Sequence, residues 1–332
     1  RQLEIIHKIL SSRGLDVLDI NIAQASVPEG SIVIPNQLGT APCIVFRFPE
    51  ERYPHRPTLY SLPGVPFEAI GLLPDIINDI KQHHQLADIH HKTLVTFGIP
   101  ESTLAKQIEP WEDALPKDIK LAYLPNPIVG VRLRLSTYGG VKDEQIQRID
   151  EEFAKLKEII GDAIYGEDED TLQIVIGKHL KNKGMTLSAA ESCTGGKIAS
   201  LLTSVAGASQ YFWGSVTSYD NSVKENVLGV PHEIIAQHGA VSQECVEAMA
   251  KGVNRVMNTD FAVATSGIAG PGGGSPEKPV GTAWLAVAFR DKETGKVDVV
   301  SKKVAFNSSR EVNIDRFASN ALNLLRLYLE KH

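Results

Sequence analysis

The chain has 332 residues, a formal net charge of -6 and a hydrophobic content of 42%. This length suits two or three domains, and the mild acidity offers no overall attraction to nucleic acid or to an anionic membrane. Its three cysteines lack CxxC spacing, which argues against a disulfide framework or a zinc ribbon. No run of about 18 apolar residues suggests a membrane span. We expect a reduced, cytoplasmic protein with neither membrane nor nucleic-acid partners.

Apolar residues have helical spacing from the start of the chain, at Leu3, Ile6 and Leu10. We therefore expect the chain to begin inside a helix of a domain whose start is absent, and Gly14 to end that helix. Short apolar runs bounded by turn residues then predict three strands and a helix, at residues 15–20, 43–48, 58–62 and 67–82.

A polar segment rich in histidine covers residues 82–91. Its four histidines raise the alternative of a metal site, but no carboxylate stands at ligand spacing around them. We expect a solvated linker here and place a domain boundary near residue 88. The first domain then covers residues 1–88.

The second domain is expected over residues 89–165, where the order is strand, helix, two strands and helix. Such an order predicts a small α+β unit. Its last helix, residues 143–160, carries an apolar face formed by Ile146, Ile149, Phe153, Leu156, Ile159 and Ile160. The acidic run at 166–170 marks the next boundary.

The third domain, residues 166–332, alternates between helical and strand patterns and predicts an α/β fold. Asp170 and Gln173 suggest a capping box at its first helix, which Gly184 ends. Strands are expected near 185–190, 212–218, 260–265, 280–290 and 297–305, with helices near 172–183, 195–205 and 242–257 and a closing helix near the C-terminus.

Residues 190–196 form the first candidate loop, with Glu191, Ser192, Cys193 and Thr194 at a strand-to-helix junction. Ligands of open α/β sheets bind beyond the carboxyl ends of the strands, where a helix N-terminus offers unpaired N–H groups. The alternative is a helix cap with glycines in a tight turn. The loop by itself favours neither interpretation.

A second candidate loop, residues 265–275, follows an apolar strand and contains five glycines within eight residues. Glycines allow backbone N–H groups to approach a phosphate or a planar ring closely. A long connection could also require glycine. The density of glycine directly after a buried strand favours a binding loop.

A third group of residues supplies a base for a serine nucleophile. Tyr219 and Lys224 follow the strand that ends near residue 218, and a buried lysine can lose its proton near neutral pH. Cys193 is the alternative nucleophile, because a thiolate is more reactive than a hydroxyl. Neighbouring residues of an extended strand point to opposite sides, and cysteine is the more often buried, which favours Ser192.

Five ordered motifs, at residues 190–196, 219–224, 237–242, 265–274 and 278–282, closely resemble the C-terminal domain of the CinA (competence/damage-inducible protein) family, the nicotinamide-nucleotide amidases. The resemblance implies a three-layer α/β domain that hydrolyses the carboxamide of nicotinamide mononucleotide (NMN) and needs no cofactor and no metal. It implies Ser192 as the nucleophile, activated by Tyr219 and Lys224, and Arg310 as a phosphate or active-site arginine. The remaining substrate contacts are expected from Glu191, Thr194, Gly195, Gly196, Ser266, Gly267, Ala269 and Gly270, with N–H groups near 194–196 holding the oxyanion.

The earlier segments are similar to the same family. Residues 36–42 and 62–68 resemble the second half of its molybdopterin-binding-like N-terminal domain, which is associated with ADP-ribose pyrophosphatase activity and a divalent metal. The family's earlier Gly-Asp-Glu and Thr-Gly-Gly-Leu-Gly-Pro-Thr motifs have no counterpart here, so we expect a partial α/β domain without that activity. The resemblance also implies a homodimer.

The middle segment resembles the family's KH-type linker but has no Gly-x-x-Gly loop, and over residues 90–165 it has 10 basic against 12 acidic residues. RNA binding is therefore not expected. The alternative to an amidase is a non-catalytic module that binds pyridine nucleotides or mediates assembly. Tyr219 and Lys224 beside a serine argue against that alternative.

Overall fold

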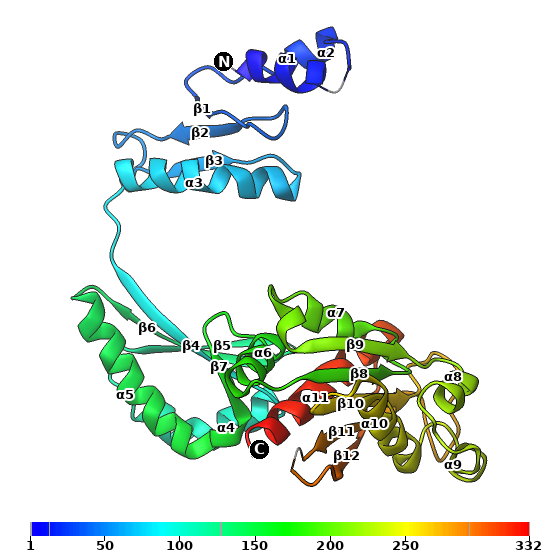
Figure 1. The fold of residues 1–332 in the computed structure, drawn as a ribbon. Helices are drawn as coiled ribbons and strands as arrows, with labels where there is room; N and C mark the ends of the chain where they lie inside the picture. The colour runs from blue at the N-terminus through cyan, green and yellow to red at the C-terminus, as the bar shows by residue number, and fades with distance from the viewer. Residues whose placement is uncertain (1, 13, 127, 292, 332) are drawn as a thin grey trace. The chain divides into compact units, whose positions relative to one another are not determined.

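The computed structural model describes residues 2–12, 14–126, 128–291 and 293–331, and the chain forms two compact units, Arg1–Ala87 and Asp88–His332 (Figure 1). The fold is mixed α/β with three separate sheets. The second unit contains both the second and the third of the expected domains. The division into three domains stays a prediction.

The first unit is a three-stranded antiparallel sheet in the order β1-β2-β3, packed against helix α3. Its small core joins apolar residues of the sheet to one face of that helix, namely Ile34, Cys43, Val45, Leu72 and Ile76. The elements are α1 (Gln2–Ser12), α2 (Asp19–Ala23), β1 (Ile32–Ile34), β2 (Cys43–Arg47), β3 (Thr58–Ser61) and α3 (Pro66–His83).

The prediction of a strand at residues 15–20 is wrong. Leu15 and Leu18 are exposed, and the short helix α2 begins at Asp19. The Asn21 side-chain oxygen accepts the N–H of Leu18 at 3.0 Å and starts the helix. An apolar run needs a partner strand to become a strand, and this run pairs with none in the described part of the chain.

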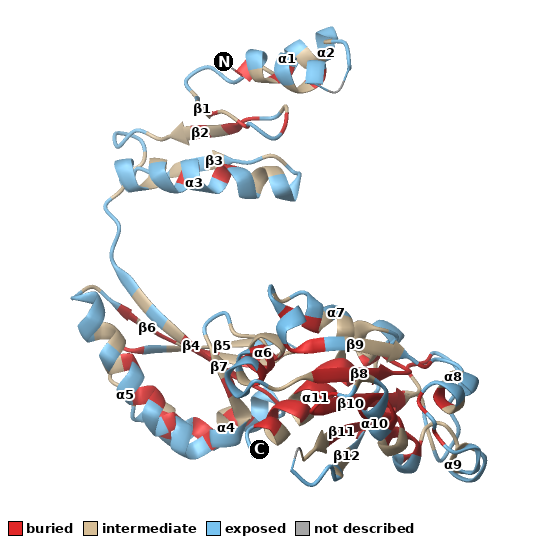
Figure 2. Ribbon diagram, viewed as in Figure 1, coloured by how far each residue is buried: buried red, intermediate tan, exposed pale blue. Residues whose placement is uncertain are grey.

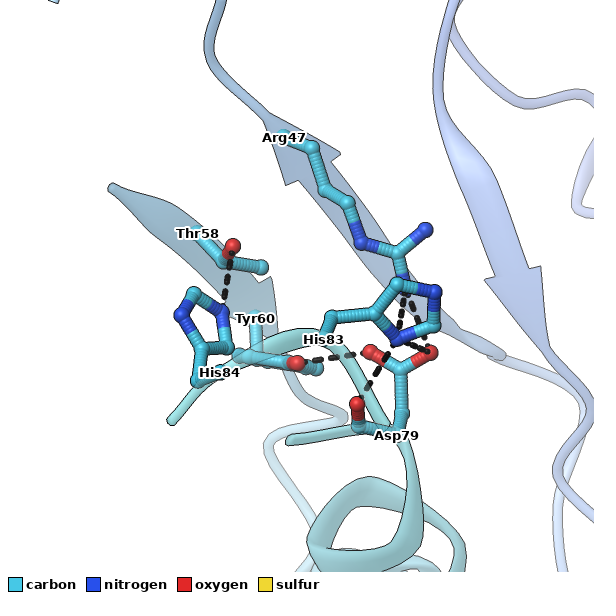
Figure 3. A network of polar contacts seen from close by, with 6 residues as sticks. All are labelled: Arg47, Thr58, Tyr60, Asp79, His83 and His84. Carbon is cyan, nitrogen blue, oxygen red and sulfur yellow. Dashed lines mark hydrogen bonds and ion pairs between the residues drawn. The ribbon is translucent and has the colours of Figure 1, made fainter. Parts of the chain in front are cut away.

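A polar cluster fixes the end of α3 to the sheet (Figure 3). The Asp79 carboxylate accepts hydrogen bonds from Tyr60 Oη at 2.6 Å and Arg47 Nη2 at 2.5 Å. Burial, followed by the hydrogen bond to Asp79, raises the pKa of Tyr60 to about 12. Burial also acts to raise the pKa of Asp79, but the bonds from Tyr60 and Arg47 outweigh it and lower that pKa.

The histidine-rich segment is therefore only partly a linker. His83 lies in α3 and bonds to the backbone oxygen of Asp79 at 2.8 Å, and His84 bonds to Thr58 at 2.9 Å (Figure 3). His90 and His91 belong to the next strand, β4. Residues 85–88 are left between the helix and that strand. No group of three or more metal-ligating side chains is found among the described residues.

The first part of the second unit is a four-stranded antiparallel sheet in the order β5-β6-β4-β7, with α4 and α5 packed on one face. Ile159, expected on the buried face of α5, is exposed. The acidic run at 166–170, which was expected to mark a domain boundary, begins inside strand β7 (Ile164–Glu167). The elements are β4 (Ile89–Thr96), α4 (Glu101–Asp113), β5 (Lys120–Asn126), β6 (Gly130–Tyr138), α5 (Lys142–Ile160), the 3-10 turn η1 (Gly161–Ala163) and β7 (Ile164–Glu167).

The rest of the unit is built on a five-stranded sheet in the order β12-β11-β10-β8-β9. Strand β8 is parallel to both β10 and β9, whereas β10, β11 and β12 are antiparallel. The elements are α6 (Leu172–Lys183), β8 (Leu187–Glu191), α7 (Lys197–Thr203), η2 (Ala208–Gln210), β9 (Phe212–Thr217), α8 (Asn221–Asn226), α9 (His232–His238), α10 (Gln243–Met257), β10 (Phe261–Gly267), β11 (Thr282–Arg290), β12 (Val297–Ala305) and α11 (Arg310–Leu329).

Helices cover both faces of this sheet and make three layers. One core joins α6, α7 and α11 to the sheet, and a second core joins α10 to the opposite face. Every residue of β8 is buried, as the red strands in Figure 2 show. Strands that are buried on both faces need near-continuous apolar sequence, which β10 supplies from Phe261 to Ala264. The expected three-layer α/β fold is confirmed.

One local expectation in this part is wrong, and two helices were missed. The capping box of Asp170 and Gln173 does not form, because the Asp170 carboxylate instead accepts from the N–H of Glu167 at 3.2 Å and from Lys178 at 2.6 Å. Helices α8 and α9 were not predicted, since both are short. No helix in the described ranges is long and apolar enough to cross a membrane.

Candidate active site

A cavity of about 290 Å³ opens at the carboxyl ends of the parallel strands β8 and β10. Its wall is formed by the loops after β8, β9, α9 and β10, by the end of β10, by helix α8 and by the first residue of α11. The lining residues are Ser192, Cys193, Tyr219, Asn221, Lys224, Ala240, Val241, Ser266, Gly267, Ile268, Ala269, Gly270, Gly272, Gly273 and Arg310. This is the edge at which open α/β sheets bind ligands.

The cavity brings together most of the residues that the sequence analysis selected. Those that line it are Ser192, Tyr219, Lys224, Ser266, Gly267, Ala269, Gly270 and Arg310. Four selected residues, Glu191, Thr194, Gly195 and Gly196, do not line it. These four residues lie instead in and around the turn that leads into α7.

Lys224 is buried, with 1% of its surface exposed, although lysine is normally a surface residue. The Asp220 carboxylate caps α8 by accepting the N–H of Ser222 at 2.9 Å, and this short helix turns Lys224 inward. Its Nζ donates to the backbone oxygens of Ser218 at 2.8 Å and Tyr219 at 3.3 Å. Burial lowers the pKa of Lys224, which makes its neutral, basic form more accessible.

Ser192 stands immediately after β8 and is held by its backbone. Its N–H donates to Thr265 O at 3.0 Å, which joins the loop to the neighbouring strand β10. Within the described residues, no hydrogen bond joins Ser192 Oγ to Lys224 or Tyr219. The three residues therefore share one cavity without direct contact between their functional groups.

Cys193 borders the same cavity but is part of the main hydrophobic core. Burial raises the pKa of its thiol to about 12. At neutral pH almost none of the reactive thiolate is then present. This environment favours Ser192 over Cys193 as the nucleophile.

Glu191 has a structural position that the sequence analysis did not foresee. Its fully buried carboxylate accepts the N–H groups of Gly196 at 3.1 Å, Ile198 at 2.9 Å and Ala199 at 2.9 Å, together with the hydroxyl of Thr194 at 2.7 Å. We correct the expected substrate contacts of Glu191, Thr194 and Gly196 accordingly. The carboxylate caps α7, which would otherwise start with unpaired donors.

Two of the expected oxyanion donors, the N–H groups of Gly195 and Gly196, have other partners, and the role of the N–H of Thr194 stays a prediction. The N–H of Gly195 donates to Ser192 O at 3.1 Å, and that of Gly196 is taken by Glu191. Ala269 and Gly270 line the cavity, are buried, and have N–H groups without a partner in the described part of the structure. Buried backbone donors are rarely left unpaired, so these two are the stronger candidates for holding an anion.

Arg310, the first residue of α11, ties two walls of the cavity together. Its Nη1 donates to Gly270 O at 2.6 Å and its Nη2 donates to Tyr219 Oη at 2.9 Å. One turn later, Asn313 donates from Nδ2 to Ala269 O and Ser308 O, both at 3.0 Å. The sequence analysis missed Asn313, for which the only signal is its spacing of three residues from Arg310 on one helix face.

Gly270 shows why the loop needs glycine. Its φ of +92° is unfavourable for other residues, and a Cβ atom there would lie 2.5 Å from Val280 Cγ1. Gly272 in the same loop has open space at the corresponding position. The close packing behind Gly270 keeps the carbonyl that Arg310 contacts in place.

Comparison with known proteins shows which family the chain is similar to. A family model described as the CinA C-terminal domain matches residues 169–329, and one described as the damage-inducible protein CinA KH domain matches residues 91–166. The "CinA-like protein" of Cytophaga hutchinsonii is 41% identical over 320 residues, which cover 96% of this chain and 73% of that protein. The "CinA-like protein" of Flavobacterium psychrophilum is 43% identical over 311 residues, covering 93% and 71%.

A solved structure is similar in sequence over part of the chain. It is the competence/damage inducible protein CihA from Agrobacterium tumefaciens, 38% identical, covering 48% of this chain and 93% of its own, with a TM-score of 0.44. The chain belongs to the CinA family.

Proposed function

We propose that the cavity hydrolyses the carboxamide of NMN to nicotinate mononucleotide and ammonia. The observation that carries this proposal is the placement of a buried lysine of lowered pKa in one cavity with Ser192 and a glycine loop. A serine nucleophile needs a base, and lysine serves when burial favours its neutral form.

In the proposed reaction, Ser192 Oγ attacks the carboxamide carbon and gives its proton to the neutral Lys224 amine. The C–N bond then breaks, and the nitrogen leaves as ammonia with a proton from the Lys224 ammonium. Water hydrolyses the resulting ester of Ser192 and regenerates the hydroxyl. In this proposal Tyr219, whose Oη accepts a hydrogen bond from Arg310, relays the proton between the serine and the lysine once substrate is bound.

Anion binding falls to the glycine loop and to Arg310. The unpaired N–H groups of Ala269 and Gly270 suit the oxyanion of the tetrahedral intermediate. The Arg310 guanidinium is exposed at the mouth of the cavity and suits the phosphate of the nucleotide. The N–H groups at the start of α7 take no part in the proposed anion binding, because the Glu191 carboxylate already accepts hydrogen bonds there.

The direct test is incubation of the purified chain with NMN, with ammonia and nicotinate mononucleotide measured separately. We expect equal amounts of the two products, and none from Ser192→Ala protein with an unchanged melting temperature. No product under conditions in which another CinA family protein is active would contradict the proposal.

One observation favours a second candidate, a non-catalytic pyridine-nucleotide-binding module. Lys224 Nζ already donates to two backbone oxygens, and no hydrogen bond to Ser192 Oγ exists within the described residues. This candidate predicts saturable binding of NMN without ammonia release, and binding that Ser192→Ala leaves intact.

A further inference from the structure

A second cavity, of about 420 Å³, lies inside the second unit between its four-stranded and five-stranded parts. One wall comes from the segment 97–101 after β4 and from the β5 and β6 strands. The other comes from Phe306 after β12 and from Arg316 and Asn320 on α11. None of its lining residues belongs to the candidate active site.

The cavity is mostly apolar and has the size of a small-molecule site. Its lining includes an aromatic residue on each side, Phe97 and Phe306, and several aliphatic residues on the wall of Phe97, namely Ile99, Pro100, Pro125 and Val131. Cavities of this volume and composition commonly bind small ligands, with a few polar groups fixing their orientation.

Arg316 supplies the charge. Its guanidinium lies 5.3 Å from the centre of the Phe306 ring, and its one hydrogen bond, to Ser308 Oγ, is long at 3.4 Å. No carboxylate of the described residues lies within ion-pair distance of it, although Glu101 also borders the cavity. A half-buried guanidinium without a counter-charge is a ready partner for an anion.

Asn320 adds an acceptor. Its Nδ2 donates one proton to Arg316 O at 2.8 Å, which leaves Oδ1 and the second N–H to meet a ligand. We propose that this cavity is a second ligand site, which takes a flat aromatic molecule bearing a carboxylate or a phosphate. The ring would lie between the apolar walls, and the anionic group would meet Arg316.

A chain of contacts joins this site to the candidate active site. Arg316 contacts Ser308 Oγ, the backbone oxygen of Ser308 accepts from Asn313, and Asn313 also holds Ala269 O in the glycine loop. Binding itself is independent of the proposed amidase function.

The test measures binding of 1-naphthoate, a flat aromatic carboxylate, by calorimetry or ligand-observed NMR. We expect one saturable site per chain that saturating NMN does not displace. The neutral isostere 1-naphthamide should bind at least about tenfold more weakly, because it cannot form the charge-assisted bond to Arg316. 1-Naphthyl phosphate should compete with 1-naphthoate, and its relative affinity shows which anion the site prefers.

Four variants make the test specific. Arg316→Gln should weaken 1-naphthoate binding at least about tenfold, whereas Arg148→Gln, at an arginine paired with Asp118 on the outside of α5, should not change it. Ile99→Trp should block the site by filling it without altering its charge. Ser192→Ala should bind normally, so a failed amidase proposal leaves this result unaffected.

The proposal is overturned if folded Arg316→Gln protein, with an unchanged melting temperature, binds 1-naphthoate as tightly as the unmodified chain. Displacement by NMN would place the ligand in the other cavity and would overturn it equally. So would equal affinity for 1-naphthoate and 1-naphthamide.

Discussion

The loops after β8 and β10 stand side by side at the same edge of the sheet but use their backbone donors in opposite ways. After β8, the donors at the start of α7 are consumed by Glu191 of the same loop. After β10, the N–H groups of Ala269 and Gly270 have no hydrogen-bond partner among the described residues and lie beside the cavity. The comparison shows that the first loop spends its backbone donors on its own side chains, whereas the second loop keeps donors available for the anion binding that we propose.

The strongest way to break this division is to remove the side chain that the first loop fixes. Ser192→Ala should lower NMN turnover by about a thousandfold or more. Cys193→Ala should keep most of it, because the Cys193 thiol has a pKa of about 12 and stays protonated. Iodoacetamide should leave the rate unchanged. Inactivation by iodoacetamide, with an active Ser192→Ala enzyme, would move the nucleophile to Cys193.

Removal of the base should have the next largest effect. Lys224→Met should lower turnover by about a hundredfold or more, the range of general-base catalysis. The rate of the unmodified enzyme should rise with pH through the lowered pKa of Lys224, because only the neutral amine accepts a proton. A pH profile that Lys224→Met leaves unchanged would assign the base elsewhere.

Stability gives an independent check on Lys224. Its folded pKa is lower than its unfolded value of about 10.4, so between these values the unfolded chain binds the extra proton. Stability therefore rises with pH through that window. Below the folded pKa the cost of burying the charged amine is fully present, and above the unfolded value it is gone. Denaturation of Lys224→Met protein across this window should lack the rise. If the stability of the unmodified chain and of Lys224→Met protein changed with pH in the same way, Lys224 would not be desolvated.

The first loop can be tested by weakening its cap. Glu191→Gln replaces an oxygen that accepts N–H groups with an NH2 group, and we expect a loss of about 2 kcal/mol in the free energy of unfolding. Turnover should fall with little change in KM, because Glu191 positions Ser192 and does not touch the substrate. Glu277→Gln, at an exposed site, serves as the control. A change in KM without a change in turnover would instead indicate that Glu191 contacts the substrate.

The second loop can be tested with a matched pair of glycines. Gly270→Ala introduces a Cβ into a position of positive φ and close to Val280, and it should raise the KM for NMN several-fold and cost about 1–2 kcal/mol of stability. Gly272→Ala meets no atom within 4 Å and should change neither. Equal effects of the two substitutions would show that general loop flexibility, not the shape at Gly270, controls binding.

The comparison also shows what could be predicted from the sequence. The strands, the main helices and the loops that carry Ser192, Lys224 and Gly270 follow from apolar periodicity and from glycine and hydroxyl clusters. The role of Glu191 did not, because a side chain that folds back onto its own helix looks identical in sequence to one that faces a ligand. Helix α8, which buries Lys224, was too short to give a periodic signal.

The failures in the first unit have a different cause. The apolar run at 15–20 has strand composition, yet it pairs with no strand in the described part of the chain, and Asn21 caps a helix instead. The cavity between the four-stranded and five-stranded parts of the second unit could not be predicted from the sequence either. It depends on Arg316 and on Phe97, which are more than two hundred residues apart.

Trapping with hydroxylamine tests the central claim, an ester of Ser192 formed by loss of ammonia, most directly. Hydroxylamine added during NMN turnover should attack this ester and yield the hydroxamate of nicotinate mononucleotide in place of part of the acid, while ammonia release continues. Ser192→Ala protein should form neither nicotinate mononucleotide nor its hydroxamate. Continued ammonia release with no hydroxamate at any hydroxylamine concentration would contradict the account, because water would then attack the carboxamide directly.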